Sequence, residues 1–153
     1  MATTSNNYAE AAMLIRKPVA EVFQAFIDPT VTTKFWFTKS SGKLEVDKTI
    51  EWTWEMYNHT FQVTAKEIIA NEKILLQWGD DSESQVEWHF KTLEEGAFIT
   101  IQSTGFKGST DELISQIRDA TGGFTWVLAG LKAYLEHNIQ LNLVADRYPS
   151  GLS

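Results

Sequence analysis

The N-terminal part of the chain changes from the alternating pattern of a strand to the spacing of a helix. Residues 8–16 alternate weakly between apolar and polar side chains, which predicts a first strand. In residues 18–27 the apolar side chains recur every three or four positions, which marks one face of a helix. Asp28-Pro29 ends this helix, because a residue before proline avoids the helical conformation. Residues 30–37 then predict a second short helix or turn that ends in aromatic side chains.

A long central region alternates with a period of two and predicts an antiparallel sheet. The expected strands cover residues 43–46, 50–57, 60–70, 73–78, 85–92 and 97–103. Asn58-His59 fits a two-residue hairpin turn, and the other connections are also short. Strands joined this closely pair as antiparallel neighbours, so the region predicts a single continuous sheet with one apolar face.

The C-terminal third returns to helical spacing. Residues 110–118 predict a short helix, and residues 124–145 carry the longest helical pattern of the chain. At 1.5 Å per residue the second helix would be about 30 Å long, enough to cross several strands. Four glycines flank the expected short helix: Gly105, Gly108, Gly122 and Gly123. They are consistent with turns of positive φ or with the hinges of a mobile gate over a cleft.

The order of these elements predicts one α+β domain over residues 8–148, with flexible tails at residues 1–7 and 149–153. The expected sheet has six to seven strands, counting the first strand of the chain. Two short helices separate that first strand from the others. Such a sheet twists strongly, and its apolar face matches the apolar stripe of the long helix. A twisted sheet that curls around a helix can leave an aromatic-lined cleft where the two surfaces diverge.

Composition and charge narrow the class of protein further. The chain has 153 residues, and 13 Lys and Arg against 20 Asp and Glu give a net charge of −7. This balance provides no basic footprint for nucleic acid. The absence of cysteine excludes disulfides, thiolate metal sites and cysteine nucleophiles. The polar start and the lack of a long apolar segment predict neither a signal peptide nor membrane insertion, so a cytoplasmic location is expected.

Aromatic side chains are the unusual feature of this composition, with 6 Trp, 9 Phe and 4 Tyr. Several of them lie at the inward positions of the expected strands, where they either fill a core or border a ligand cavity. Buried tryptophan needs a partner for its N–H group, which favours a cavity over pure filling. The candidate ligand-binding residues are Trp52, Trp54, Trp78, Trp88, Phe90, Trp126 and Leu131.

No motif in the sequence supports catalysis, a metal site or a cofactor. The histidines are His59, His89 and His137, and no two have metal-ligand spacing. No serine stands in a nucleophile elbow, and no glycine-rich phosphate loop is present. An enzyme would need a titratable group that points into the cleft. The inward positions offer few such groups, and the candidates are Lys66 and Glu67, near the end of an expected strand.

Several motifs occur together in the sequence: residues 26–37 (FIDPTVTTKFWF), Gly42-Lys-Leu44, the Trp52/Trp54 strand, Gly105-Phe106 and residues 122–137 (GGFTWVLAGLKAYLEH). As a set they resemble the START-like superfamily, whose helix-grip fold is shared with the birch pollen allergen and polyketide cyclases. The branch most similar to them is the C-terminal domain of the activator of the heat-shock protein 90 ATPase. The resemblance covers about residues 11–144 and implies a curved sheet wrapped around a long C-terminal helix.

Three functional hypotheses remain open, because this fold hosts carriers, receptors, cyclases and cochaperones. The first is a binding module for a small hydrophobic or aromatic molecule, lipid-like or polyketide-like, held between sheet and helix. The second, implied by the resemblance alone, is a partner of a chaperone. The third is an enzyme of cyclase or hydrolase type that uses the same cavity.

Overall fold

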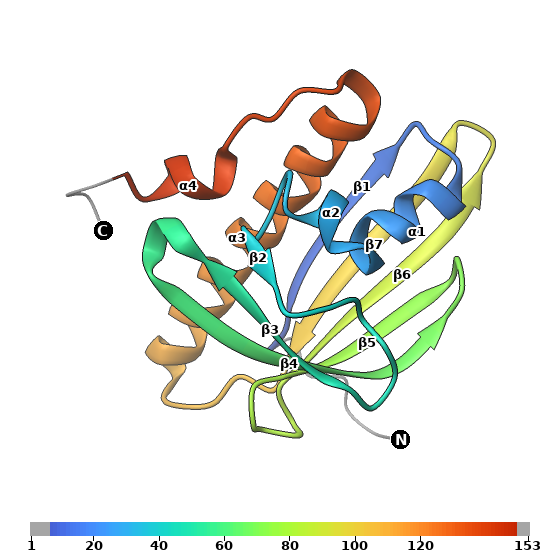
Figure 1. Cartoon of the computed structure of the whole chain (residues 1–153). Helices are drawn as coiled ribbons and strands as arrows, with labels where there is room; N and C mark the ends of the chain where they lie inside the picture. Colours follow the sequence, from blue (N-terminus) through green and yellow to red (C-terminus); the bar gives the residue numbers. More distant parts are fainter. Residues whose placement is uncertain (1–6, 150–153) are drawn as a thin grey trace.

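A curved antiparallel sheet wraps around a long helix in the computed structural model, which describes residues 7–149 (Figure 1). The strands are β1 Ala9–Ile15, β2 Lys39–Ser40, β3 Thr49–Trp54, β4 His59–Ile69, β5 Lys73–Trp78, β6 Gln85–Leu93 and β7 Gly96–Thr104. The helices are α1 Val19–Ile27, α2 Pro29–Thr32, α3 Thr110–His137 and α4 Leu143–Arg147. This arrangement confirms the predicted α+β helix-grip fold.

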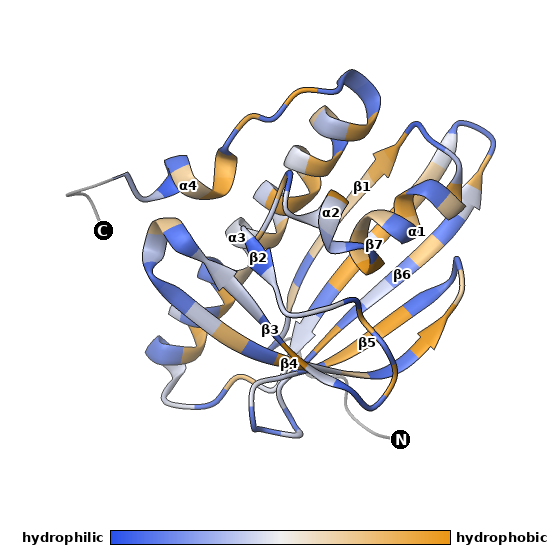
Figure 2. Cartoon of the chain, viewed as in Figure 1, coloured by the Kyte–Doolittle hydropathy of each residue, from blue (hydrophilic) through white to orange (hydrophobic). Residues whose placement is uncertain are grey.

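The described strands form one sheet in the order β1-β7-β6-β5-β4-β3-β2, with antiparallel pairing throughout. Burial alternates at every residue of β7, so one face of the strand is the core face. Figure 2 shows the same alternation of apolar and polar residues along other strands. The inward positions predicted for Trp52, Trp54, Trp88 and Phe90 are confirmed, since each is less than a tenth exposed.

The long helix α3 packs chiefly along β1, at one edge of the sheet. The Lys132 ammonium donates a hydrogen bond to the Leu14 carbonyl at 2.9 Å, and the Arg16 backbone N–H donates to the Glu136 carboxylate at 2.9 Å. These contacts hold the C-terminal half of α3 against the strand. The middle of α3 lies outside these contacts and borders a hollow beneath the sheet.

The short helix α1 covers β6 and β7 (Figure 1). Its apolar stripe, predicted from the spacing, is buried at Val22, Phe23 and Phe26. The helix starts directly after Pro18 and stops at Asp28, whose side chain accepts the Thr30 backbone N–H at 3.0 Å and so caps α2. Both ends lie where the two prolines predicted them.

Two expected details of the sheet are wrong. Residues 43–46 form no strand; Val46 makes one isolated parallel bridge to Ala65, while β2 pairs with β3 in their place. The turn at Asn58-His59 is also longer than expected, because Glu55–Tyr57 forms a 3-10 turn and only Asn58 has a positive φ, at 48°. Local alternation did not reveal either irregularity.

The separation into a short and a long C-terminal helix is wrong as well. α3 continues from Thr110 through Gly122 and Gly123 to His137, and its first turn carries a capping box between Ser109 and Glu112. Each mid-helix glycine costs about 1 kcal/mol relative to alanine, which the capped and packed helix tolerates. Beyond His137 the chain leaves the helix at Asn138, which has a left-handed conformation, and forms α4 instead of extending α3 to residue 145.

The predicted tails, residues 1–7 and 149–153, lie outside the described residues except for Asn7 and Pro149. Within residues 7–149, none of the helices combines the length and apolar character that crossing a membrane requires.

Candidate functional site

A cavity of about 300 Å³ lies between the sheet, the middle of α3 and the C-terminal segment, residues 138–149. The sheet contributes Trp78, Val86 and Ser103 to its lining. Ala120, Gly123, Phe124, Trp126 and Val127 line it from α3. This is the divergence of sheet and helix that the twist of the sheet predicts, and its volume is at the lower end for small-ligand sites.

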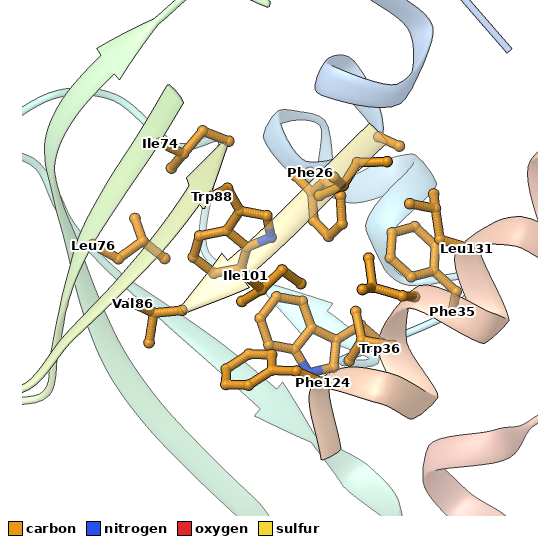
Figure 3. Packing of buried hydrophobic residues seen from close by; sticks show 14 of the residues in the cluster. Phe26, Phe35, Trp36, Ile74, Leu76, Val86, Trp88, Ile101, Phe124 and Leu131 are labelled. Carbon is orange, nitrogen blue, oxygen red and sulfur yellow. The ribbon is translucent and has the colours of Figure 1, made fainter. Parts of the chain in front are cut away.

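Three rings form the inner side of the cavity and are called the aromatic wall: Trp36, Trp78 and Phe124. The Trp36 ring stacks on Trp78 with centroids 6.3 Å apart and an angle of 13°, and it meets Phe124 edge to face at 6.0 Å. Figure 3 shows Trp36 and Phe124 side by side in the lower part of the buried cluster. Because Trp36 follows α2, the residues after the first helix pair close the cavity from within.

The C-terminal segment covers the cavity. Val144 and Tyr148 line it from this segment, and the Tyr57 hydroxyl donates hydrogen bonds to the carbonyl oxygens of Val144 and, at 3.4 Å, Ala145. The Tyr148 hydroxyl donates to Asp119 on α3 at 3.1 Å. Burial raises the pKa of the Tyr57 hydroxyl above its ordinary value, so this group stays protonated and remains a donor. The hydroxyl groups of two tyrosines thus hold the C-terminal segment over the cavity.

Of the candidate ligand-binding residues, Trp78 and Trp126 line this cavity, Trp78 half-buried and Trp126 40% exposed. The other five are buried away from it: Trp52, Trp54, Trp88, Phe90 and Leu131. Correct strand parity placed them inside the protein, but neighbouring side chains fill the space around them. Their role in binding a ligand stays a prediction.

The packing of these five residues explains why they do not reach the cavity. The Trp52 ring stacks on Phe37 with centroids 4.5 Å apart, and Trp54 meets the same phenyl ring at 6.1 Å. Phe90 lies 5.3 Å from Phe23, a residue of α1. In Figure 3 Trp88 lies between Phe26 and Ile74, and Leu131 is on the α3 side of the same core.

Sequence reasoning missed most of the cavity lining. Trp36 belongs to the aromatic end of residues 30–37 but is not among the candidate ligand-binding residues, and Phe124 begins the helical pattern of residues 124–145 without being a candidate either. No sequence pattern indicated that Tyr57 borders a cavity. The C-terminal segment was also missed, because the helical pattern of residues 124–145 continues over residues that form α4 instead. The apolar pair Leu143-Val144, directly after Asn142, which precedes the first residue of α4, was the available hint of a separate element.

The titratable groups of the lining, within the described residues, are Tyr57, Arg147 and Tyr148; no carboxylate or imidazole is among them. Lys66 and Glu67, the candidates for a group inside the cleft, do not point there. Lys66 is exposed, and Glu67 forms an ion pair with Lys73 at 2.6 Å on the outer face. The bulge between Ala65 and Glu67 changes the register at this point.

A loop next to the cavity carries acidic side chains that a cation could neutralise, and a lysine does so. The Lys107 ammonium lies 2.9 Å from Asp81 and 3.1 Å from Glu83. The Glu83 backbone N–H and the Lys107 ammonium hold the pKa of Asp81 below its ordinary value. Residues 7–149 contain no group of three or more side chains arranged to hold a metal ion.

Comparison with known proteins identifies relatives of this fold. A family model described as "Activator of Hsp90 ATPase homolog 1-like protein" matches residues 16–136. A comparison with curated proteins found no match. Among solved structures, protein SSP2350 from Staphylococcus saprophyticus is 28% identical, with a TM-score of 0.78 over 88% of this chain and 95% of that chain.

Two more distant structures share the fold. The Aha1 dimer from Colwellia psychrerythraea is 18% identical, with a TM-score of 0.73 over 85% of this chain and 96% of that chain. DynU16, from the dynemicin biosynthetic locus, is 17% identical, with a TM-score of 0.78 over 89% of this chain and 49% of that chain. At these identities the likeness shows the fold alone.

Proposed function

We propose that this chain, which belongs to the family of activator of Hsp90 ATPase homolog 1-like proteins, binds a small hydrophobic or aromatic molecule. The observation that carries the proposal is the cavity of about 300 Å³ beneath the C-terminal segment, with its aromatic wall of Trp36, Trp78 and Phe124. Pockets of this kind, mostly apolar with a few polar groups, are typical of sites for small ligands. A lipid-like or polyketide-like molecule is the ligand class that matches the lining.

Burial of the apolar surface of the ligand supplies most of the affinity, at about 25 cal/mol per Å². The entropy lost on association and on ordering the cover opposes this gain, so a dissociation constant in the micromolar range is expected. Because Trp36 and Trp78 border the cavity, binding is expected to change the intrinsic tryptophan fluorescence.

The test is a titration with N-phenyl-1-naphthylamine, a neutral aromatic probe whose fluorescence rises in an apolar site. Saturable binding to the protein is expected, together with its loss in Ala120→Trp, which places a large ring in the cavity from α3. The matched control is Ala20→Trp, which adds the same ring on the exposed side of α1. Circular dichroism checks that all three proteins are folded.

Either of two results would remove the support for this function. The folded wild-type protein could give no saturable signal with the probe or with a panel of fatty acids and flavonoids. Alternatively, Ala120→Trp could bind the probe as well as Ala20→Trp does, which would place binding outside the cavity.

A second candidate function is a partnership with a heat-shock protein 90 chaperone. The description of the matching family and the likeness to an Aha1 protein favour it. Co-purification with the chaperone and an increase of its ATPase turnover are the expected results; an unchanged turnover with no co-purification would exclude this function. Both functions are proposed for a cytoplasmic protein.

A further inference from the structure

Arg147 is the one charged residue in the cavity lining within the described part of the chain. The other lining residues are aromatic, aliphatic or hydroxyl-bearing, or are glycine. The protein as a whole is acidic, with a net charge of −7. A positive charge at an apolar cavity of an acidic protein is therefore a local feature that the overall composition does not account for.

An aromatic ring holds the guanidinium group of Arg147 in place. It stacks over the Tyr148 ring, 4.3 Å from the ring centroid. Within residues 7–149, Arg147 forms no ion pair. The nearby Asp119 accepts the hydrogen bond of the Tyr148 hydroxyl, so Tyr148 holds both the cation and this carboxylate. The guanidinium therefore keeps its hydrogen-bond donors available.

A structural role alone does not account for this position. Arg147 is the last residue of α4, where a cation offsets the negative end of a helix, but α4 has only five residues and a small dipole. The side chain is exposed, although it lies on the cavity lining and above an aromatic ring. This combination places a planar donor group at the cavity mouth, between water and the apolar interior.

We propose that the ligand is an amphipathic anion: its apolar body lies against the aromatic wall, and its acidic group pairs with Arg147 at the mouth. This inference rests on the proposed binding function and names the class of ligand. A guanidinium fork matches the two oxygens of a carboxylate, and stacking reduces the freedom that the side chain loses on pairing.

The location of the charge also keeps the cost of binding an anion low. A carboxylate buried among Trp36, Trp78 and Phe124 would lose its hydration without compensation. At the mouth it exchanges part of its hydration for hydrogen bonds to an exposed arginine. A wholly neutral ligand would make no use of this charge, so the lining favours an acid over its neutral counterpart.

The test uses two competitors of nearly equal size and shape, anionic 2-naphthoate and neutral 2-naphthamide, which displace N-phenyl-1-naphthylamine from the protein. The wild-type protein is expected to prefer the naphthoate by about fivefold, the range for a charge-assisted pair at an exposed site. The preference falls to about one in Arg147→Met and is partly retained in Arg147→Lys. High salt reduces it in the wild-type protein.

Arg16→Met is the matched control, because it removes the same charge from an exposed side chain near the other end of α3. It is expected to keep the wild-type preference. Equal displacement by both competitors in the wild-type protein would overturn the anionic ligand, and so would a preference that Arg147→Met leaves unchanged. The probe itself reports on the proposed function: if the probe binds and the competitors do not differ, only the inference fails.

Discussion

The apolar face of the sheet has two halves that differ in what covers them. In the packed half, α1 lies over β6 and β7, and Phe23, Phe26, Trp88 and Phe90 fill the space between them. In the cavity half, the middle of α3 and the C-terminal segment cover the sheet and leave a hollow of about 300 Å³, which the aromatic wall borders. Both halves have the same alternating pattern, so the covering element decides whether aromatic side chains form a core or a site.

The packed half contains a buried polar group whose desolvation is unfavourable. Trp88 is 1% exposed, and its indole N–H has no hydrogen-bond partner in the described part of the chain. An unpartnered buried donor costs about 1–3 kcal/mol, which the burial of a large ring offsets. The expectation that buried indoles indicate a cavity is therefore unreliable here, because this indole belongs to the packed half.

The largest expected effect separates two tryptophans of the sheet. Trp88→Ala leaves a void in the packed half and should lower the free energy of unfolding by about 3–5 kcal/mol. Trp78→Ala, at a half-buried position on the cavity, should cost about half as much and mainly weaken probe binding. Urea unfolding of both variants measures the difference. Equal losses would mean that the two halves are packed alike.

Adding volume should separate the halves in the opposite direction. Val22 on α1 and Val127 on α3 are 0% and 1% exposed, and only Val127 borders the cavity. Val22→Leu should destabilise the protein by about 1–3 kcal/mol through overpacking, whereas Val127→Leu can extend into the hollow and should cost less than about 0.5 kcal/mol. Thermal and urea unfolding provide the measurement, and a similar cost at both positions would contradict an open cavity.

Removal of one hydroxyl tests the cover of the cavity. Tyr57→Phe loses the hydrogen bonds to the Val144 and Ala145 carbonyls and should cost about 1 kcal/mol at neutral pH. It should also speed amide hydrogen exchange in residues 143–148. The control is Tyr134→Phe, since the Tyr134 hydroxyl makes no hydrogen bond within the described residues.

The pH dependence of this effect has a defined sign. Because the folded protein raises the pKa of Tyr57 above its ordinary value of 10.0, the protonated hydroxyl stabilises the folded state. This contribution is complete below pH 10.0 and disappears as the pH rises through the higher value of the folded state. The stability difference between wild type and Tyr57→Phe should therefore shrink above pH 10.0, and a constant difference would argue against the bonded hydroxyl.

The smallest effect concerns the glycines beside the cavity. A Cβ at Gly122 would meet no atom within 4 Å, so Gly122→Ala should stabilise α3 by about 0.5–1 kcal/mol. Gly105→Ala should have the opposite effect and destabilise the protein, because the φ of Gly105 is +88° and an added Cβ would lie 2.0 Å from the Glu83 carbonyl oxygen. Stopped-flow mixing with the probe tests the hinge hypothesis: slower association in Gly122→Ala would support it, and an unchanged rate would oppose it.

Local patterns predicted the elements well where one rule dominated. The alternation around Trp52 and Trp88 indicated strands and the inward face, and the two prolines marked the start and end of α1. They failed where two signals competed. Gly122-Gly123 resembled a helix break, but the capping box and packing carry α3 through it, and apolar side chains beyond Asn138 suggested a longer helix.

The sequence by itself determined the layers of this protein, because strand and helix periodicity are local and a buried face needs only apolar side chains at the right spacing. The tertiary structure decided which part of the apolar face stays hollow. That outcome depends on where α1, Trp36 and the C-terminal segment return to the sheet, and these contacts join residues far apart in the chain. Tyr57 and Arg147 are likewise far apart in the sequence, and only the folding of the chain brings both to the cavity lining.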